Sequence, residues 1–142
     1  MNSKLKDLAE KVQTLLLNAG FIVHRYDAYS TNSIYLKLDY GVANSIRISD
    51  HMGKQHLHYR FNLADVDKYT EDKSGKYPRF IFPYRSYKQM VNRIVGAKEY
   101  KLSLYGEDGY QERMKRYKRE AKNEKGFWQQ ARQVKRKKEY EK

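Results

Sequence analysis

Near the middle of the chain, three histidines and one aspartate form a cluster of side chains that could bind a metal or act as acids and bases. His56 and His58 are two apart in an alternating run, so both imidazoles point to one face of a strand. Asp50 and His51 precede them across a short turn. Imidazole and carboxylate groups are ligands for zinc and similar divalent metals. One hypothesis is therefore a metal-dependent nuclease. The simpler interpretation is that these polar residues occupy the solvent-exposed face of a β-hairpin.

Ser49, Asp50 and His51 also have the residue types of a nucleophile, an orienting acid and a base. Neighbouring residues on a strand point to opposite faces, so a contiguous triplet cannot form a relay by itself. A nuclease also needs acidic residues clustered to hold a metal against phosphate, and the aspartates of this chain show no such spacing. The sequence therefore predicts that the protein is not an enzyme and has no catalytic residues, metal or cofactor.

The C-terminal tail is strongly basic and interleaved with aromatic residues. Residues 110–142 hold 13 Lys and Arg against 5 Glu, in a chain of 142 residues with a net charge of +13. This excess of positive charge attracts polyanions, of which nucleic acid is the commonest in a cell. An acidic protein surface is an alternative partner. Cations three or four apart on a helix can track phosphates, and aromatic rings can stack on bases. The residues predicted to bind nucleic acid or another partner are Arg113, Arg116, Arg119, Lys122, Phe127, Trp128, Arg132, Lys135 and Arg136.

The composition of the chain argues against several other classes of protein. The chain has no cysteine, which excludes disulfides and thiolate metal sites and fits a reducing cytoplasm. No apolar run is long enough to span a bilayer, and no secretory segment is visible. No segment combines a basic face with a continuous apolar one, as a helix on a membrane surface would. We therefore expect a cytoplasmic protein without membrane contact.

Two helices are predicted to frame the chain. Residues 3–19 have apolar positions at helical spacing, with Ser3 as a plausible N-cap and Gly20 as the glycine that ends the helix. A second helix begins after the capping-box pattern Ser86-x-x-Gln89. Its apolar positions predict that it packs on a sheet.

The sheet is predicted from runs that alternate or are rich in β-formers. The last of them contains a proline, which suits an edge strand. The predicted strands are residues 21–26, 33–40, 45–51, 56–61 and 79–84.

Together these elements predict an α+β fold: an N-terminal helix, an antiparallel sheet of three to five strands, a packed second helix and a basic C-terminal helical extension. The GEDG stretch at residues 106–109 is a break. We therefore divide the chain into an α+β domain, residues 1–105, and a basic helical extension, residues 106–142. The extension is either one long helix or two helices hinged near Gly126.

Two of the predicted strands carry a pattern, S-x-Y…I-R-I-S-D-H, that resembles a recurring motif of small proteins from phages and mobile elements of Gram-positive bacteria. It is similar to the motif of the type II-A anti-CRISPR proteins of streptococcal phages, which inhibit Cas9. The resemblance implies a phage or mobile-element origin, the cytoplasm of a bacterial host cell and anti-defence work. The motif residues are Ser33, Tyr35, Arg47, Ser49, Asp50 and His51.

The motif also has a structural interpretation. Arg47 is expected on the same sheet face as Ser33 and Tyr35, where guanidinium, hydroxyl and phenol can interact. Asp50 and His51 are expected to end the strand by hydrogen-bonding into the turn. Direct contact with a partner is the alternative role.

Three functions follow in order of preference. The first is a non-catalytic anti-CRISPR protein that binds a Cas nuclease with its guide RNA, above all Cas9, and blocks target-DNA binding or cleavage. The second is a nucleic-acid-binding accessory protein of a phage or mobile element. The third is the metal-dependent nuclease.

Overall fold

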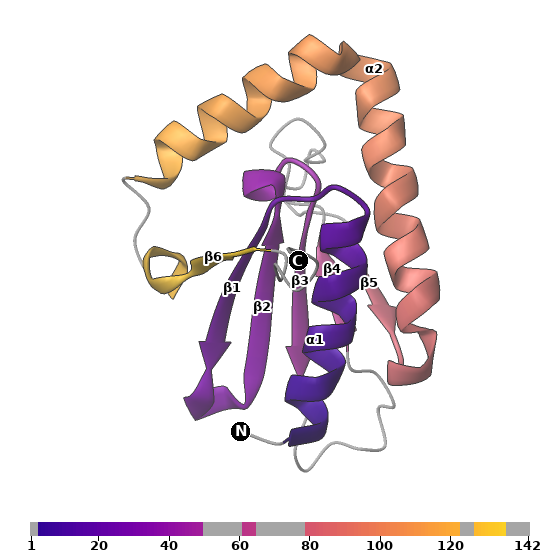
Figure 1. Cartoon of the computed structure of the whole chain (residues 1–142), viewed down its shortest axis with the longest axis vertical. Helices are drawn as coiled ribbons and strands as arrows, with labels where there is room; N and C mark the ends of the chain where they lie inside the picture. The colour runs from indigo at the N-terminus through magenta and orange to yellow at the C-terminus, as the bar shows by residue number, and fades with distance from the viewer. Residues whose placement is uncertain (1–2, 50–60, 65–78, 123–126, 136–142) are drawn as a thin grey trace, which may run out of the picture.

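The computed structural model describes residues 3–49, 61–64, 79–122 and 127–135. Helix α1 (Ser3–Asn18) precedes five strands, the long helix α2 (Tyr87–Ala121) and a sixth strand (Figure 1). All six strands join one antiparallel sheet in the order β5-β4-β3-β2-β1-β6, which confirms the predicted α+β class. The strands are β1 (Val23–Ala28), β2 (Ser33–Leu38), β3 (Asn44–Ser49), β4 (Phe61–Ala64), β5 (Arg79–Phe82) and β6 (Arg132–Val134).

The end of α1 follows the sequence prediction. Gly20 has a φ of 90°, a left-handed conformation that glycine adopts without strain. Its N–H donates to the carbonyl of Leu17 at 3.0 Å, and the N–H of Phe21 donates to the carbonyl of Leu16 at 3.1 Å. This pair of bonds is the Schellman motif, which satisfies the last helical carbonyls. Phe21 thereby turns into the core, where it is buried.

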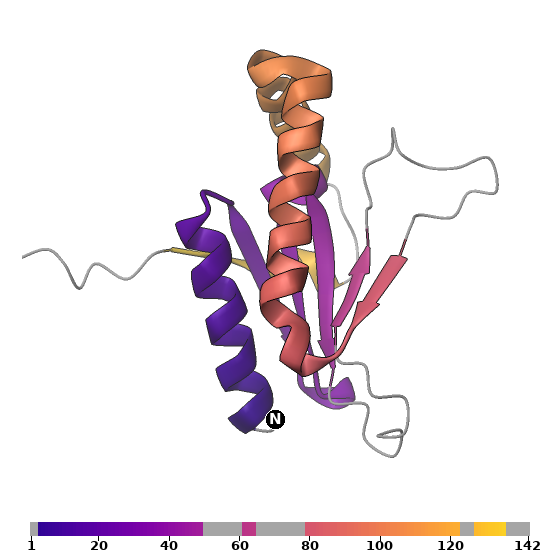
Figure 2. The same ribbon diagram turned by 90° about the vertical axis from the view of Figure 1, so that its right-hand side faces the viewer.

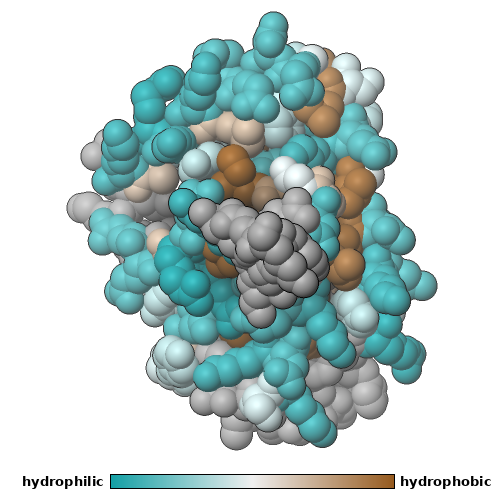
Figure 3. All heavy atoms as spheres, in the orientation of Figure 1, coloured by the Kyte–Doolittle hydropathy of each residue, from teal (hydrophilic) through white to brown (hydrophobic). Residues whose placement is uncertain are grey.

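The core lies between one face of the sheet and the two helices. α1 and the first part of α2 both lie on this side (Figure 2). The apolar positions of β2 and β3 alternate inward as predicted, and the apolar stripe of α1 packs onto them. Figure 3 views the molecule from the helix side, where hydrophilic residues dominate and hydrophobic ones appear only in separate patches. The fully buried strand residues include Ile34, Leu36, Leu38, Ile46 and Ile48.

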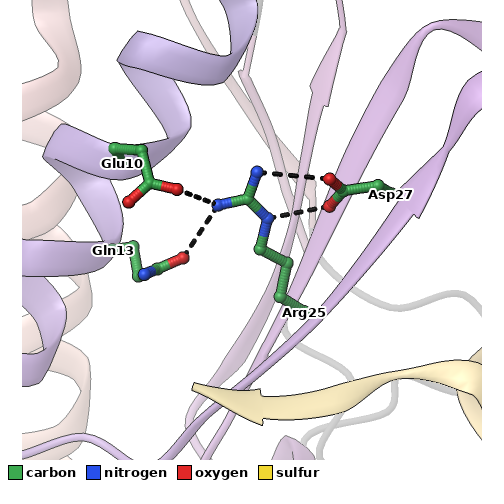
Figure 4. Close-up of polar contacts among 4 residues, drawn as sticks. All are labelled: Glu10, Gln13, Arg25 and Asp27. Carbon is green, nitrogen blue, oxygen red and sulfur yellow. Dashed lines mark hydrogen bonds and ion pairs between the residues drawn. The ribbon is translucent and has the colours of Figure 1, made fainter. Parts of the chain in front are cut away.

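An arginine is buried at the edge of this core. Arg25 extends from β1 toward α1, and its guanidinium bonds Asp27 at 2.8 and 3.3 Å, Glu10 at 2.7 Å and Gln13 at 3.0 Å (Figure 4). Burial by itself lowers the pKa of Arg25, but hydrogen bonds and charges from Asp27 and Glu10 outweigh burial and raise this pKa overall. The cation therefore stays charged and ties α1 to the sheet.

Helix α2 changes direction at Gly106, inside the stretch where the sequence predicted a break. Gly106 has φ 77° and ψ 163°, a region that is accessible essentially to glycine alone. Beyond the kink, Tyr110, Met114 and Tyr117 form a second buried cluster with Val42. Tyr117 is therefore a packing residue, with little of its surface exposed. α2 thus turns at one end of the sheet and continues across that end (Figures 1 and 2).

Three local predictions need correction. Ser86 lies at the N-cap of α2 but makes no side-chain capping bond, so the capping box is not formed. The strand predicted over residues 21–26 begins two residues later, at Val23. Part of the tail is not helical, because Arg132–Val134 pairs with β1 as β6 and buries Val134. The sheet therefore has six strands in place of the three to five predicted. This pairing satisfies backbone groups that an open strand edge would leave unpaired.

Other predictions stay open. The strand predicted over residues 56–61 falls mostly outside the described residues. The division of the chain at residues 105 and 106 remains a prediction. In the part of the chain that the structure describes, no helix is long and apolar enough to cross a membrane.

Candidate functional site

The second face of the sheet, which points away from the core, carries a row of two tyrosines and an arginine. Strand register places Tyr26 opposite Tyr35, and Tyr35 opposite Arg47. The two phenol rings have centroids 6.5 Å apart, and the guanidinium carbon of Arg47 lies 6.0 Å from the centroid of the Tyr35 ring. We call these three residues the tyrosine row. They are half-buried, so each keeps part of its surface accessible.

A second row crosses the same face one step nearer the end of the sheet where α2 crosses. Register aligns Gln133, His24, Lys37 and Ser45 on four neighbouring strands. In β1, β2, β3 and β6, none of the positions on this second face holds an Asp or Glu. Asp27 belongs to the core side, where it is paired with a buried arginine. These strands therefore present cations and aromatic rings from positions of the second face that hold no carboxylate.

A cavity of about 310 Å³ lies where the last turns of α2 approach this second row. The volume is at the lower end of the range for small-molecule sites. The strands contribute the floor, Lys118 comes from the last turn of α2, and Lys122 is the C-cap residue of that helix. We call this space the α2 cavity. Within the described part of the chain, its lining residues are His24, Lys37, Tyr40, Lys118, Ala121, Lys122, Ala131 and Gln133, none of them acidic.

His24 is the central titratable group of the α2 cavity. Its ring centroid lies 5.1 Å from that of Tyr40, and its Nδ1 atom is buried without a hydrogen-bond partner within the described part of the chain. Burial, then the positive charges of Lys37 and Lys118, lower the pKa of His24. Since the ordinary value is 6.5, the imidazole is neutral at pH 7 in the unliganded protein.

Tyr40 reaches the α2 cavity from a strained turn. The turn η2 (Asp39–Gly41) has three consecutive positive φ angles, 52° at Asp39, 60° at Tyr40 and 98° at Gly41. A left-handed backbone is unusual for tyrosine and persists where surrounding contacts enforce it. The Nζ atom of Lys118 lies 5.8 Å from the centroid of the Tyr40 ring, within cation–π range.

A buried carboxylate supplies the enforcing contacts. Asp39 is 1% exposed and accepts hydrogen bonds from the N–H of Ile22 at 2.9 Å and from the hydroxyl of Tyr110 at 2.5 Å. It also pairs with Lys98, whose Nζ lies 3.0 Å from Asp39 Oδ2. Lys98 and Tyr110 come from opposite sides of the Gly106 kink. Asp39 therefore joins the two parts of α2 to the turn that presents Tyr40.

Lys101 strengthens the same connection from α2. Its ammonium is buried and donates to the backbone carbonyls of Val42 at 2.7 Å and Ala43 at 3.1 Å. A buried carbonyl needs a hydrogen-bond donor, because leaving it unpaired is costly. The helix thereby holds the segment immediately after η2.

The motif residues of β2 and β3 come together as the sequence predicted. Arg47 donates from Nε and from one terminal nitrogen to the hydroxyl of Ser33, at 3.3 Å each, and lies across from Tyr35 on the same face. Ser33 and Ser49 form a buried cross-strand pair. The motif therefore has a structural function in joining β2 to β3. Asp50 and His51 lie outside the described residues.

The basic residues predicted along α2 do not share one helix face. A spacing of three residues advances about 300° around a helix, so each successive side chain is displaced by about 60°. Arg113 lies over a tyrosine ring at 3.6 Å, whereas Arg116 bonds a glutamate one turn further along. Arg119 is exposed, and Lys122 lines the α2 cavity.

The remaining tail residues are only partly described. Arg132 and Lys135 are exposed at and just after β6. Phe127 and Trp128 belong to a short 3-10 helix, but their side chains lie outside what the structure describes, as does Arg136 altogether. Their assignment to partner binding stays a prediction.

The nuclease hypothesis rests on Asp50, His51, His56 and His58, all of which fall outside the described residues. Across residues 3–49, 61–64, 79–122 and 127–135, no group of three or more His, Asp or Glu side chains is placed to hold a metal ion.

Sequence reasoning missed most residues of the α2 cavity and one tyrosine of the tyrosine row. Alternation alone assigns His24 and Tyr26 to the solvent-facing side of β1, as it assigns Tyr35 and Lys37 to that side of β2. The sequence thus contained the signal for these two residues. It contained no signal for the approach of Lys118, which depends on the path of α2 after Gly106.

Comparison of the chain with protein-family models, with curated protein sequences and with solved structures finds no match, so the site rests on its own geometry.

Proposed function

We propose that the protein binds single-stranded nucleic acid, without chemistry of its own, on the second face of its sheet. The observation that carries the proposal is the tyrosine row beside the α2 cavity, on strand positions that hold no carboxylate. Single strands are commonly bound by aromatic side chains on a sheet surface, flanked by cations that follow the backbone.

Each part of this face has a defined contribution. The rings of Tyr26 and Tyr35 offer π-faces to successive bases, which tolerates any base sequence. Arg47 adds a planar cation at the end of the row. Lys118 and Lys122 approach from α2 and supply positive charge for the sugar–phosphate backbone. The net charge of +13 steers the polyanion to the molecule.

A titration of fluorescent single-stranded and duplex oligonucleotides with the full-length protein tests this function. We expect single strands to bind more tightly than duplex, because only unpaired bases expose their faces to tyrosine. If three phosphates are neutralised, a plot of log Kd against log salt concentration should have a slope of about 2, because single strands contribute about 0.7 per phosphate. Failure to bind either RNA or DNA single strands at low salt would exclude the proposal.

The motif on β2 and β3 favours a second candidate function. Ser33, Tyr35 and Arg47 lie next to one another on the second face, and their pattern resembles that of type II-A anti-CRISPR proteins. We propose as this second candidate that the protein inhibits a CRISPR nuclease, above all Cas9, in the cytoplasm of a bacterial host. It would contact the guide RNA through the tyrosine row and block target-DNA binding or cleavage.

A pull-down distinguishes the two candidates. Tagged protein is incubated with Cas9, with and without guide RNA, and Cas9 cleavage of target DNA is measured in parallel. The inhibitor function predicts retention of the Cas9–guide complex and loss of cleavage at near-stoichiometric amounts. Retention of free RNA alone, with cleavage unaffected, would leave only the nucleic-acid-binding function.

A further inference from the structure

We propose that the α2 cavity binds the terminal phosphate of a nucleic-acid strand whose adjoining bases lie on the tyrosine row. This inference rests on the function proposed above and names the part of the strand that the cavity takes. The two features are neighbours, because His24 and Tyr26 are two residues apart on β1, about 7 Å along the strand.

The charge of the α2 cavity suits a terminal phosphate better than an internal one. Lys37, Lys118 and Lys122 line it, and none of its described lining residues is an Asp or Glu. A phosphate monoester carries close to two negative charges at neutral pH, whereas a backbone phosphodiester carries one. A cluster of three ammonium groups therefore discriminates in favour of the strand end, as point charges do around a compact anion.

The position of the cavity also favours a strand end. The last turns of α2 bound the second face at this point, with Lys118, Ala121 and Lys122 lining the same opening as His24 and Lys37. Its volume of about 310 Å³ accommodates a group of small-molecule size and not a continuing duplex. The α2 cavity thus lies two residues along β1 and β2 from the tyrosine row, on the side that α2 bounds.

His24 supplies an unused polar atom at this place. Its buried Nδ1 lacks a hydrogen-bond partner within the described part of the chain, and the ring packs against Tyr40. The charged groups that face it are Lys37 from β2 and Lys118 from α2, which together with burial keep its pKa low. A bound dianion reverses the local field, so binding raises this pKa and draws a proton onto the imidazole.

Oligonucleotides of one sequence with a 5′-phosphate, a 3′-phosphate or hydroxyls at both ends test the inference on the full-length protein. We expect one phosphorylated end to bind about tenfold more tightly than the hydroxyl-ended strand, as for one added charge-assisted hydrogen bond. Between about pH 8 and pH 6.5, where the monoester keeps most of its second charge, that preference should grow as the pH falls, because binding is coupled to protonation of His24. His24→Asn should abolish the growth.

Lysine variants locate the effect. The end preference is the ratio of Kd for the hydroxyl-ended strand to Kd for the phosphorylated strand. Lys118→Gln and Lys122→Gln should each reduce this ratio toward one. Lys115→Gln is the matched control, since Lys115 is exposed on the same helix and pairs with Glu112 at 3.5 Å. It should change binding of all strands equally and leave the preference intact.

The outcomes separate this inference from the function beneath it. Equal binding of phosphorylated and hydroxyl-ended strands would overturn the inference while the proposed function stands. Absence of binding by every strand would overturn both. Inorganic phosphate or a nucleoside monophosphate that binds as tightly as the phosphorylated strand would assign the cavity to a small phosphorylated molecule and overturn the strand-end assignment.

Discussion

Replacing the two tyrosines of the tyrosine row is expected to cause the largest loss of nucleic-acid binding. Stacking of a base on an aromatic side chain contributes about 1–3 kcal/mol, so Tyr35→Ala alone should raise Kd about 5- to 150-fold. Tyr26→Ala should act in the same direction. Because the rings are 6.5 Å apart, the double variant should lose less than the sum of the single changes. Fluorescence anisotropy with a short single-stranded oligonucleotide measures each effect.

Two matched variants separate stacking from folding. Tyr35→Phe keeps the ring and loses the hydroxyl, so binding should stay close to that of the wild-type protein. Tyr100→Ala removes a tyrosine of α2 that is 68% exposed and belongs to neither the tyrosine row nor the α2 cavity, so it should leave Kd unchanged. A Tyr35→Ala variant that melts like the wild-type protein and still binds with unchanged Kd would contradict the role of the tyrosine row.

Removal of the buried carboxylate of Asp39 is expected to cause the largest loss of stability. Asp39→Ala leaves Lys98 without its anion and the N–H of Ile22 and the hydroxyl of Tyr110 without an acceptor. Breaking one side of a buried charged pair costs about 3–5 kcal/mol. Alanine also fits the φ of 52° less well than aspartate does. Urea unfolding, followed by circular dichroism, should show half-unfolding at a lower urea concentration than in the wild-type protein.

The conservative variant Asp39→Asn isolates the charge. Asparagine tolerates the left-handed backbone and keeps one acceptor oxygen, so its cost should be smaller, about 1–3 kcal/mol. Asp108→Asn provides the control because Asp108 is exposed on α2, and it should change stability by less than about 0.5 kcal/mol. Equal stability of Asp39→Ala and Asp108→Asn would show that Asp39 does not join α2 to the turn η2.

Much of the core and one part of the site were predictable because they depend on local periodicity. The stripe of α1 and the alternation of β2 and β3 correctly identified buried residues such as Leu16, Ile34 and Ile46. Alternation also placed Tyr35 and Arg47 on one face, and their contact confirms it. Side-chain direction in a regular element follows from its geometry alone.

The buried ionic contacts were not predictable in this way. Asp39 and Tyr110 are 71 residues apart, and Arg25 reaches Glu10 on a different element. A charged residue in a sequence is normally assigned to the surface, because burial of a charge is costly unless partners surround it. Those partners appear only when α1, η2 and α2 are packed together.

The sequence by itself determined which side chains share a strand face or a helix stripe, because rotation per residue is a local property of the backbone. Only the tertiary structure decided that Lys118 and Lys122 meet His24 and Lys37 in the α2 cavity. The direction of α2 after Gly106 is set by the contacts of its second part with Val42 and Asp39, not by the glycine itself. Likewise β6 joined the sheet because β1 offered an unpaired edge that a helical tail would have left open.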